Sequence, residues 1–548
     1  MDERIARVVA YHERTKHGYP QRFARSLGHL DWAAQPDPFR RYEGAELVVL
    51  EEVPPGEGRE ATWGRVCSGT VDAASVDARA IAQLFYDSLA ISAWKQAGSS
   101  KWALRCNPSS GNLHPTEGYL LCGAVDGITE TAALFHYAPH VHGLERRRVI
   151  ADDAWRVLSA QLPEGAIVIG LTSIVWREAW KYGERAFRYC MEDVGHAIGA
   201  VTIAARTLGW SVRTIEGLGD DAIARLLAVG DQVGPEAERP DVLLAIVPRG
   251  DAGGAIAVAL DEAELASLIA APAIGVANAL SEDHHDWPVL EEVEEATRMD
   301  VRGSAGHALE IGVAVRESSV ETRPLVRRRR SAVDMDGRTS LPRARFFEML
   351  RTLVPALTPA LWALPFRAQV HPVIFVHRVE GIEPGLALLV RDAEDEPALR
   401  GAIALAEDWT ALPDAPDDLP LYGIASGDAR HIARAACCHQ DIAADGAFAI
   451  AFLARFEPAL EAHGAAFYRR LHWDAGLLGQ LLYLEAEAAG VQATGIGCYF
   501  DDAIHELLGL GDRTFQVLYC FTVGVAVHDA RIQTLPAYGQ RSTLLAPR

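Results

Sequence analysis

Two polar segments of this chain carry residue types that bind anions. The segment "RCNPSSGNLHPTEGY" at 105–119 places an arginine, two serines, an asparagine and a histidine in one tight turn. The segment "VRRRRSAVDMDG" at 326–337 has four consecutive arginines followed by a serine. Guanidinium groups and hydroxyls bind phosphate and carboxylate groups well. Both segments also have a simpler interpretation, because Asn-Pro and Ser-Ser-Gly-Asn form surface turns and arginine runs form solvated basic patches.

The other reactive residue types form no catalytic or metal-binding pattern. His114 and His371 each precede a proline and are expected to shape turns. The adjacent cysteines of "CCHQD" at 437–441 have the wrong spacing for a tetrahedral metal site, so we expect them in the core. The sequence has no convincing P-loop, dinucleotide fingerprint or Ser-His-Asp set. It therefore predicts no metal site.

The composition is that of a large globular protein with more than one core. The chain has 548 residues, 49% of them hydrophobic, and 52 Lys and Arg against 74 Asp and Glu give a formal net charge of -22. This acidic balance argues against nucleic acid or an anionic membrane as a partner. The eight cysteines have no C-x-x-C spacing, and neither a signal peptide nor a membrane span is evident. We therefore expect a cytoplasmic protein.

An internal repeat relates the two parts of the chain. Residues 183–227 align without a gap on residues 464–508, at a constant offset of 281. The matched positions include Gly183 with Gly464, Arg188 with Arg469, Asp193 with Asp474, Gly195 with Gly476, Gly209 with Gly490, and "DDAI" at 220–223 with "DDAI" at 501–504. Such a match is improbable by chance, so the sequence predicts two copies of one domain.

Each copy has the pattern of a mixed α+β unit. A long apolar helix ends at Gly209 or Gly490, and a short extended segment, a glycine-containing loop and an amphipathic helix opened by Asp-Asp follow. A strand comes next, at 241–248 in the first copy and at 515–524 in the second. We predict a domain over 1–255, a connecting segment with helical patterns over 256–320, and a second domain over 321–548.

The two polar segments occur in different copies. The second copy has "LPFRAQVHP" at 364–372, which keeps His-Pro but lacks the Pro-Ser-Ser-Gly-Asn turn of the first. The first copy has no arginine cluster in the stretch that corresponds to 326–337. Each copy has therefore retained one part of a single composite site.

The chain resembles the nitroreductase superfamily of FMN-dependent oxidoreductases, and its first half is similar to the SagB/ThcOx-type dehydrogenases. The resemblance rests on "YHERTKH" at 11–17, "RCNPSSGNLHPTE" from Arg105, "KYGERAFRY" at 181–189 and "RRRRS" at 327–331. In this superfamily two identical subunits usually hold FMN at their interface. The resemblance implies two nitroreductase-like domains that form an intrachain pseudo-dimer, so that one chain supplies both sides of a flavin site.

The resemblance also implies which residues would bind FMN. Arg329 and Ser331 fall on the family's Arg-x-Ser pattern, with Arg330 between them. The family's next basic position falls at Val333, for which Arg531 is a candidate substitute. The other implied contacts are Pro108, Ser109, Ser110 and Asn112, with Arg105 nearby, and the loop residues Ile496, Gly497 and Cys498. Helix termination alone would also explain a glycine-rich turn at the last three.

We expect one FMN per chain, because only one of the two crossed sites would have both polar segments. The other site would have "EGLG" at 216–219 without an arginine cluster or a serine turn. The azoline-oxidising relatives imply Lys181 and Tyr182 as the candidate base, although such residues at a helix end also cap or snorkel. The absence of a nicotinamide fingerprint leaves NAD(P)H open as a transient reductant.

Two functions fit these patterns. The first is an FMN-dependent oxidoreductase, a flavin dehydrogenase or reductase, that acts on a small-molecule or peptide-derived substrate. The alternative is a flavin-binding or partner-binding protein whose catalysis has lapsed, which the loss of one site would fit. The sequence favours the enzyme, because one complete crossed site remains.

Overall fold

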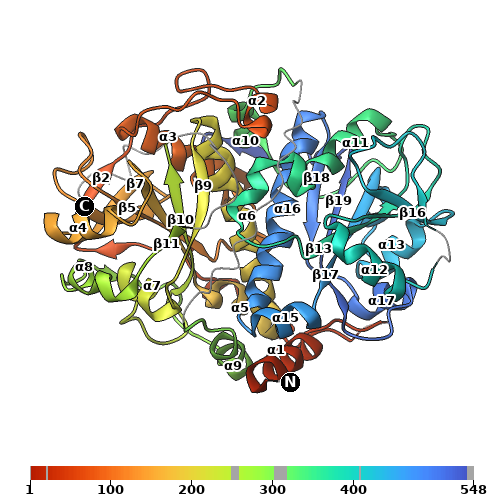
Figure 1. Cartoon of the computed structure of the whole chain (residues 1–548), viewed down its shortest axis with the longest axis horizontal. Helices are drawn as coiled ribbons and strands as arrows, with labels where there is room; N and C mark the ends of the chain where they lie inside the picture. Colours follow the sequence, from red (N-terminus) through yellow and green to blue (C-terminus); the bar gives the residue numbers. More distant parts are fainter. Residues whose placement is uncertain (1, 20–21, 249–257, 301–317, 406–408, 540–548) are drawn as a thin grey trace.

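Two similar α+β halves lie side by side in the computed structural model of the chain, with the N-terminal half on the left of Figure 1. The structure describes residues 2–19, 22–248, 258–300, 318–405 and 409–539. Parts of the expected connecting segment 256–320 lie outside these residues. No described helix is long and apolar enough to cross a membrane.

The first half is built on one sheet, whose neighbouring strands are antiparallel except for β11 and β9. The described strands follow one another across this sheet in the order β11 (Val258–Ala259), β9 (Ser211–Glu216), β10 (Arg239–Val247), β8 (Ile167–Ser173), β5 (Thr116–Cys122), β6 (Ala133–Ala138), β7 (Gly143–Val149) and β2 (Leu47–Val49). Alternate residues of β8 face opposite sides, so that Ile169 packs into the central core and Val168 into a separate outer core.

The sheet of the second half repeats this order. Its described strands are β18 (Gln492–Ile496), β19 (Phe515–Gly524), β17 (Phe448–Arg455), β13 (Val370–Val376), β14 (Gly385–Leu389), β16 (Leu421–Ser426) and β15 (Thr410–Ala411). Strands β18, β19 and β17 correspond to β9, β10 and β8 of the first half. The structure therefore confirms the predicted α+β class and the duplication.

The two longest helices pack against each other at the centre of the molecule. These are α6 (Ala186–Thr207) and α16 (Phe467–Ala488), shown in yellow and blue in Figure 1. They cross at Gly195 and Gly476, which the repeat aligns. A Cβ atom on Gly476 would lie 2.2 Å from the Glu192 carbonyl oxygen, and one on Gly195 would lie 2.4 Å from the Trp473 carbonyl oxygen. Only glycine allows the two backbones to approach this closely.

The predicted elements of the repeat are present at the expected positions. Gly209 and Gly490 follow the long helices with φ of 73° and 77°, in the left-handed region that glycine favours. The helices opened by Asp-Asp are α7 (Asp220–Leu226) and α17 (Asp501–Leu508). The predicted strand at 515–524 is β19, and the strand predicted at 241–248 begins two residues earlier, at Arg239.

Helices α1 (Glu3–Arg14) and α9 (Pro288–Ala296) each dock on the opposite half. The His17 carbonyl, after α1, accepts a hydrogen bond from the Asp501 amide of the second half, and the Met299 carbonyl, after α9, accepts one from the Asp220 amide of the first. The two helices lie together at the bottom of Figure 1. The connecting segment therefore contains the counterpart of the N-terminal helix.

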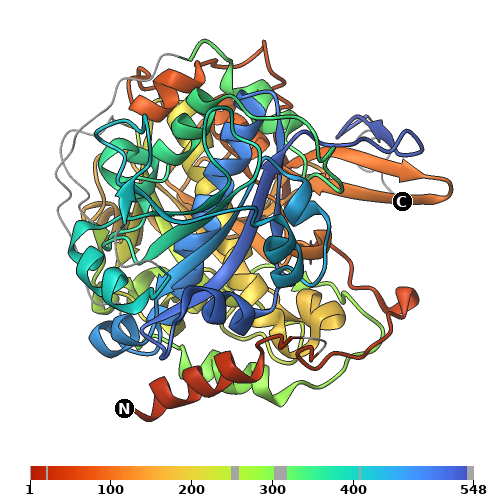
Figure 2. The same cartoon turned by 90° about the vertical axis from the view of Figure 1, so that its right-hand side faces the viewer.

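The C-terminal strand also crosses between the halves. Strand β20 (Gln533–Leu535) pairs antiparallel with β3 (Ile91–Ala97), which forms a hairpin with β4 (Ser100–Arg105). This hairpin projects from the body of the molecule at the right of Figure 2. Residues after β19 therefore reach the first half, as expected for an intrachain pseudo-dimer.

Shorter elements complete the described structure. The strands β1 (Tyr42–Glu43) and β12 (Val276–Ala277) pair with each other. The remaining described α-helices are α2 (Trp63–Ser68), α3 (Ala78–Ser88), α4 (Asp152–Ser159), α5 (Val175–Tyr182), α8 (Ala266–Ile269), α10 (Thr322–Arg328), α11 (Arg343–Arg351), α12 (Glu396–Ala402), α13 (Arg430–Ala436), α14 (Ile442–Asp445) and α15 (Glu457–His463). Among the short 3-10 helices, η6 (Pro359–Ala363) matters for the site.

Candidate active site

A cavity of about 750 Å³ lies between the two halves and takes its lining from both. The sequence-predicted residues that line it are Arg105, Pro108, Ser109, Ser110, Asn112, Tyr182, Arg329, Arg330, Ser331, Ile496, Gly497 and Cys498. Lys181 and Arg531 do not line it. The structure thus brings together the turn of the first half and the arginine cluster of the second.

One end of the cavity is basic. The buried Arg329 donates from Nε to the Cys106 carbonyl at 3.2 Å and from Nη2 to the Arg105 carbonyl at 3.1 Å. Its Nη1 is buried and has no hydrogen-bond partner among the described residues. Arg330 lies beside it, and burial together with the Arg329 charge lowers the pKa of Arg330 to about 10. Two guanidinium groups and one unpaired donor therefore lie in the lining of the cavity, a set that suits an anion.

Sequence reasoning missed Lys95, which adds a third cation to this end. Lys95 lies on β3, lines the cavity and donates from Nζ to Thr534 Oγ1 on β20 at 2.7 Å. Burial lowers its pKa. The expected substitute Arg531 instead pairs with Asp529 at 2.7 Å, and its side chain is 88% exposed. No sequence pattern predicted the β3–β4 hairpin, so none singled out Lys95.

The Ser331 hydroxyl connects the basic end of the cavity to the loop at 495–498, which we call the glycine-rich wall. Ser331 Oγ lies 2.8 Å from the Tyr483 hydroxyl, which accepts a hydrogen bond from the Gly495 amide at 2.9 Å. Further along this wall, the Tyr189 hydroxyl donates to the Gly497 carbonyl at 2.9 Å. A Cβ atom on Gly497 would lie 2.4 Å from Tyr189 Cε1, so aromatic packing alone already requires glycine there.

The Pro-Ser-Ser-Gly-Asn turn is held from below by Asp193 on α6. The Ser110 amide and hydroxyl both donate to Asp193 Oδ1 at 3.0 Å. Burial raises the pKa of Asp193 to about 7, against the hydrogen bonds from Ser109 and Ser110, which lower it. At the matched position of the second half, Asp474 accepts from the Gln369 amide at 3.3 Å. The aspartate therefore anchors this loop in both halves.

Other residues of the turn hold it against the hairpin. Asn112, at a φ of 61°, donates from Nδ2 to the Ala103 carbonyl on β4 at 2.9 Å. Arg105 donates from Nη2 to the Pro38 carbonyl at 2.5 Å, and burial lowers its pKa to about 10. Both side chains therefore donate hydrogen bonds to backbone carbonyls, and these bonds hold the wall of the cavity in place.

The Lys181–Tyr182 pair meets the turn at Gly111. A Cβ atom on Gly111 would lie 2.6 Å from the Tyr182 hydroxyl and 3.0 Å from Lys181 Nζ, and its φ of 58° also favours glycine. Tyr182 lines the cavity and its ring packs edge-on against Tyr189 at 4.6 Å between centroids. Burial lowers the pKa of Lys181, which shifts the amine toward its proton-accepting form.

The pseudo-symmetric counterpart of this cavity is filled by protein. Glu216 stands where the repeat places Gly497, and the buried Arg470 donates to both Glu216 oxygens, at 2.9 and 2.7 Å. Thr214 Oγ1 on β9 donates to the Ala363 carbonyl of η6 at 2.5 Å. Helix η6 and an ion pair therefore occupy the space that corresponds to the glycine-rich wall.

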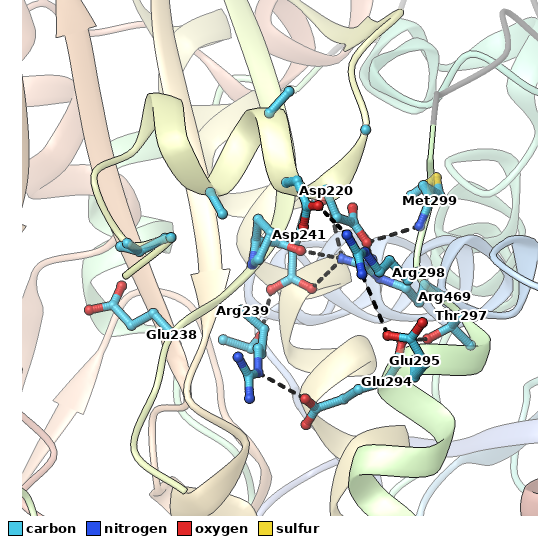
Figure 3. A pocket seen from close by; sticks show the side chains of 18 of the residues that line it. Asp220, Glu238, Arg239, Asp241, Glu294, Glu295, Thr297, Arg298, Met299 and Arg469 are labelled. Carbon is cyan, nitrogen blue, oxygen red and sulfur yellow. Dashed lines mark hydrogen bonds and ion pairs between the residues drawn. The ribbon is translucent and has the colours of Figure 1, made fainter. Parts of the chain in front are cut away.

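A second cavity, of about 800 Å³, lies between α7, α9 and the start of β10 (Figure 3). None of the sequence-predicted residues lines it. Its charged side chains pair with one another: Arg469 with Asp220 at 2.7 Å and Asp241 at 3.1 Å, and Arg239 with Glu294 at 2.9 Å. The Arg239–Glu294 pair holds α9 on the first half, and the Arg469 pairs hold α16 of the second half against α7 and β10, so these charged residues have a structural role.

The residues of the first cavity fit FMN. Arg329 Nη1, Lys95, Arg330 and Ser331 form a donor set suited to a phosphate group. The lining also contains the backbone of 495–498 and the Pro-Ser-Ser-Gly-Asn turn, where a flat ring would meet amides and small side chains. The volume lies within the range of small-molecule and cofactor sites.

Comparison with known proteins identifies the family. The family model described as "Nitroreductase family" matches residues 74–240 and 381–525, which together make up more than half of the chain. The chain therefore belongs to this family. The two matched regions fall in the two halves of the structure. This confirms the prediction that the chain contains two nitroreductase-like domains in tandem.

A solved structure from Anabaena variabilis, described as a nitroreductase, is similar over almost the whole chain, with 21% identity, a TM-score of 0.64, and coverage of 95% of this chain and 99% of that one. It shows that the two-half fold recurs. A curated Methanocaldococcus jannaschii protein, named as a nitroreductase, is 27% identical over 128 residues, which are 22% of this chain and 63% of that relative's length. An Exiguobacterium sibiricum structure, described as a nitroreductase in complex with FMN, is 14% identical with a TM-score of 0.22 and covers 39% of this chain and 91% of that one.

Proposed function

We propose that this chain is an FMN-dependent oxidoreductase that binds one FMN in the cavity between its halves. The observation that carries the proposal is the meeting of Arg329, Arg330 and Ser331 of the second half with the 108–112 turn of the first around one cavity. Membership of the nitroreductase family supports the same assignment.

When bound, the flavin supplies the two-electron transfer. The protein therefore needs to bind the flavin, orient it and the substrate, and exclude water from the site. Arg329, Arg330 and Lys95 would neutralise the phosphate of a bound FMN, and the loop at 495–498 and the turn at 108–112 would form the walls around it. Tyr182 and the neighbouring Lys181 are the candidate groups to hold or move a proton at the substrate. Substrates of the proposed enzyme are small molecules or peptide-derived groups, with NAD(P)H as the candidate reductant.

The test is to release the cofactor from purified protein by denaturation and identify it by chromatography. We expect FMN at about one molecule per chain. FAD in its place, or no flavin after incubation with FMN, would contradict the proposal.

A second measurement separates the enzyme from a flavin-binding protein without catalysis. Anaerobic absorbance spectra with NADH, NADPH and candidate substrates should show bleaching of the bound flavin. If FMN binds stoichiometrically but no donor reduces it, the binding-protein function replaces the oxidoreductase. The observation that favours this binding-protein alternative is the counterpart site, which side chains and helix η6 fill.

A further inference from the structure

Two of the eight cysteines differ from the rest in exposure and in position. Cys67, Cys106, Cys122, Cys190, Cys437 and Cys520 are buried, whereas Cys438 and Cys498 are partly exposed. The Cys438 and Cys498 Sγ atoms lie 2.7 Å apart in a thiol–thiol hydrogen bond. Cys498 lines the cavity between the halves. The core position expected for both adjacent cysteines thus holds for Cys437 only.

The local backbone holds the two thiols together. Cys498 follows β18 in the glycine-rich wall, and Cys438 follows the end of α13 in a turn where Cys438 and His439 have φ of 52° and 60°. Residues other than glycine rarely adopt this conformation. Gln440, which also lines the cavity, donates from Nε2 to the Cys498 carbonyl at 2.9 Å and so joins the two loops.

The surroundings favour a thiolate on one member of the pair. The hydrogen-bond contact with Cys438, followed by that with His17, lowers the pKa of Cys498 to about 5. The same pairing raises the pKa of Cys438. His17 accepts the Ala24 amide hydrogen bond at Nδ1, which fixes its ring. The titratable groups facing the pair are His17, Arg185, Tyr182, Tyr189 and the neighbouring Cys437.

We propose that Cys438 and Cys498 are a redox-active dithiol at the wall of the cavity, converted reversibly into a disulfide by peroxides. The Cys498 thiolate attacks one oxygen of hydrogen peroxide, the O–O bond breaks, and the second oxygen leaves as water after taking up a proton. The Cys438 thiol then attacks the sulfenic sulfur, the S–S bond forms, and a second water leaves. Two thiols and one peroxide give one disulfide and two waters, so sulfur loses two electrons.

The disulfide would change the cavity as well as the thiols. It would join the loop after α13 covalently to the glycine-rich wall, which hydrogen bonds such as that of Gln440 now hold together. Both loops line the cavity. Oxidation at this position therefore acts on the cofactor-facing wall without involving the six buried cysteines.

The first experiment treats the purified full-length protein with hydrogen peroxide at pH 6 and follows intact mass and digested peptides. We expect the loss of two hydrogen atoms, a single linkage between the peptides of Cys438 and Cys498, and full reversal by dithiothreitol. A linkage at other cysteines, or no mass change while the protein stays folded, would overturn the proposal.

Alkylation gives a readout that needs neither flavin nor turnover. Iodoacetamide at pH 6 should modify Cys498 first, at a rate near its value at pH 8. An ordinary thiol with a pKa of about 8.5 loses nearly two orders of magnitude over the same interval. Cys498 that behaves as an ordinary thiol would argue against the pair as a reactive site.

Single variants test the order of the two steps. Cys438→Ser should stop at a sulfenic acid on Cys498, seen as the gain of one oxygen atom and trapped by dimedone. Cys498→Ser should react about a hundredfold more slowly than wild type. Cys67→Ser, which changes a buried cysteine away from the cavity, serves as the control, and circular dichroism checks folding. A disulfide formed at the wild-type rate in either cavity variant would exclude the proposed pair.

Discussion

Arg329 shows at the residue scale how one half of the chain prepares the other. Two of its donors are bound by carbonyls of the first half, at Cys106 and Arg105, and its guanidinium lies 5.0 Å from the Tyr483 ring. The remaining Nη1 donor is therefore fixed in direction before any anion arrives. A buried donor without a partner is costly, and a phosphate group would remove that cost.

Replacement of Arg329 by alanine should weaken FMN binding by roughly ten-fold to a hundred-fold, since a charge-assisted hydrogen bond contributes about 1.5 to 3 kcal/mol. The matched control is Arg328→Ala, because Arg328 is half exposed and pairs with Glu487 outside the cavity lining. Titration of the deflavinated proteins with FMN, followed by flavin fluorescence, measures both affinities. Equal losses in the two variants would remove Arg329 from the phosphate site.

Lys181 and Tyr182 are separable because only Tyr182 lines the cavity. If Lys181 is the base, Lys181→Ala should keep the flavin spectrum and slow substrate-dependent flavin reduction by about 10²-fold. Tyr182→Phe should then cost less, since it keeps the ring packed on Tyr189 and removes only the hydroxyl. Stopped-flow absorbance measures both rates. Unchanged reduction in Lys181→Ala would exclude the lysine from proton transfer.

Asp193 makes stability depend on pH. Burial raises its pKa from 3.8 to about 7, so the folded protein holds a proton that the unfolded chain has lost between about pH 4 and pH 7. The contribution of the protonated Asp193 to the free energy of unfolding is present at low pH and is lost as the pH rises through 7. The Asp193→Asn variant should therefore gain stability relative to wild type from pH 5 to pH 8, by up to a few kcal/mol. Denaturant midpoints at both pH values measure this, and a constant difference would contradict it.

At the element scale, the crossing of α6 and α16 fixes the geometry of the interface between the halves. The aligned Gly195 and Gly476 face each other at the crossing, and Asp193 lies two residues from it on α6. The position of the turn above Asp193 therefore depends on how closely these helices approach.

Gly476→Ala should destabilise the protein by at least about 2 kcal/mol, because its Cβ atom would meet backbone that cannot move aside. The control is Gly401→Ala on α12, where a Cβ atom meets nothing within 4 Å. This change should be neutral or stabilising by up to about 1 kcal/mol. Denaturant unfolding measures both. A Gly476 variant as stable as the Gly401 variant would mean that the crossing is looser than its contacts indicate.

The sequence predicted those elements whose patterns are local or repeated without gaps. Strand β19 begins and ends where the apolar run at 515–524 does. The equivalence of α1 and α9 was missed, because the shared signal is only Glu-x-Thr followed by a basic residue, at 13–16 and 295–298. In both helices this threonine hydroxyl bonds the carbonyl four residues earlier.

Candidate site residues could be predicted where they fall on a family sequence pattern. They could not be predicted where only a contact between distant segments brings a residue to the cavity. The turn at 108–112 and Arg329 line one cavity, as the resemblance implied. Lys95 reaches it because β20 pairs with the β3–β4 hairpin, which no local pattern encodes. Arg531 bonds Asp529, two residues before it, and so faces solvent.

At the scale of the whole molecule, duplication has produced one open site and one filled site. The open site combines residues of both halves, and its counterpart contains the Arg470–Glu216 pair and η6. Because both halves belong to one chain, FMN binding should not require a second chain. Size-exclusion chromatography of a dilute sample should show flavin absorbance with the monomer, whereas complete loss of flavin on reaching the monomer would contradict this.

The same asymmetry predicts the flavin count. A flavin ring cannot enter the filled site without displacing the buried ion pair between Arg470 and Glu216, because Glu216 stands at the position of Gly497. Saturating FMN should therefore give about one molecule per chain. Arg329→Ala should show a single weakened site and no residual tight one, whereas Thr214→Val, which removes only the hydrogen bond from β9 to Ala363, should keep the wild-type count and affinity. Equilibrium dialysis with chromatographic quantification measures all three proteins, and two tight sites in the wild type would show that the filled site opens.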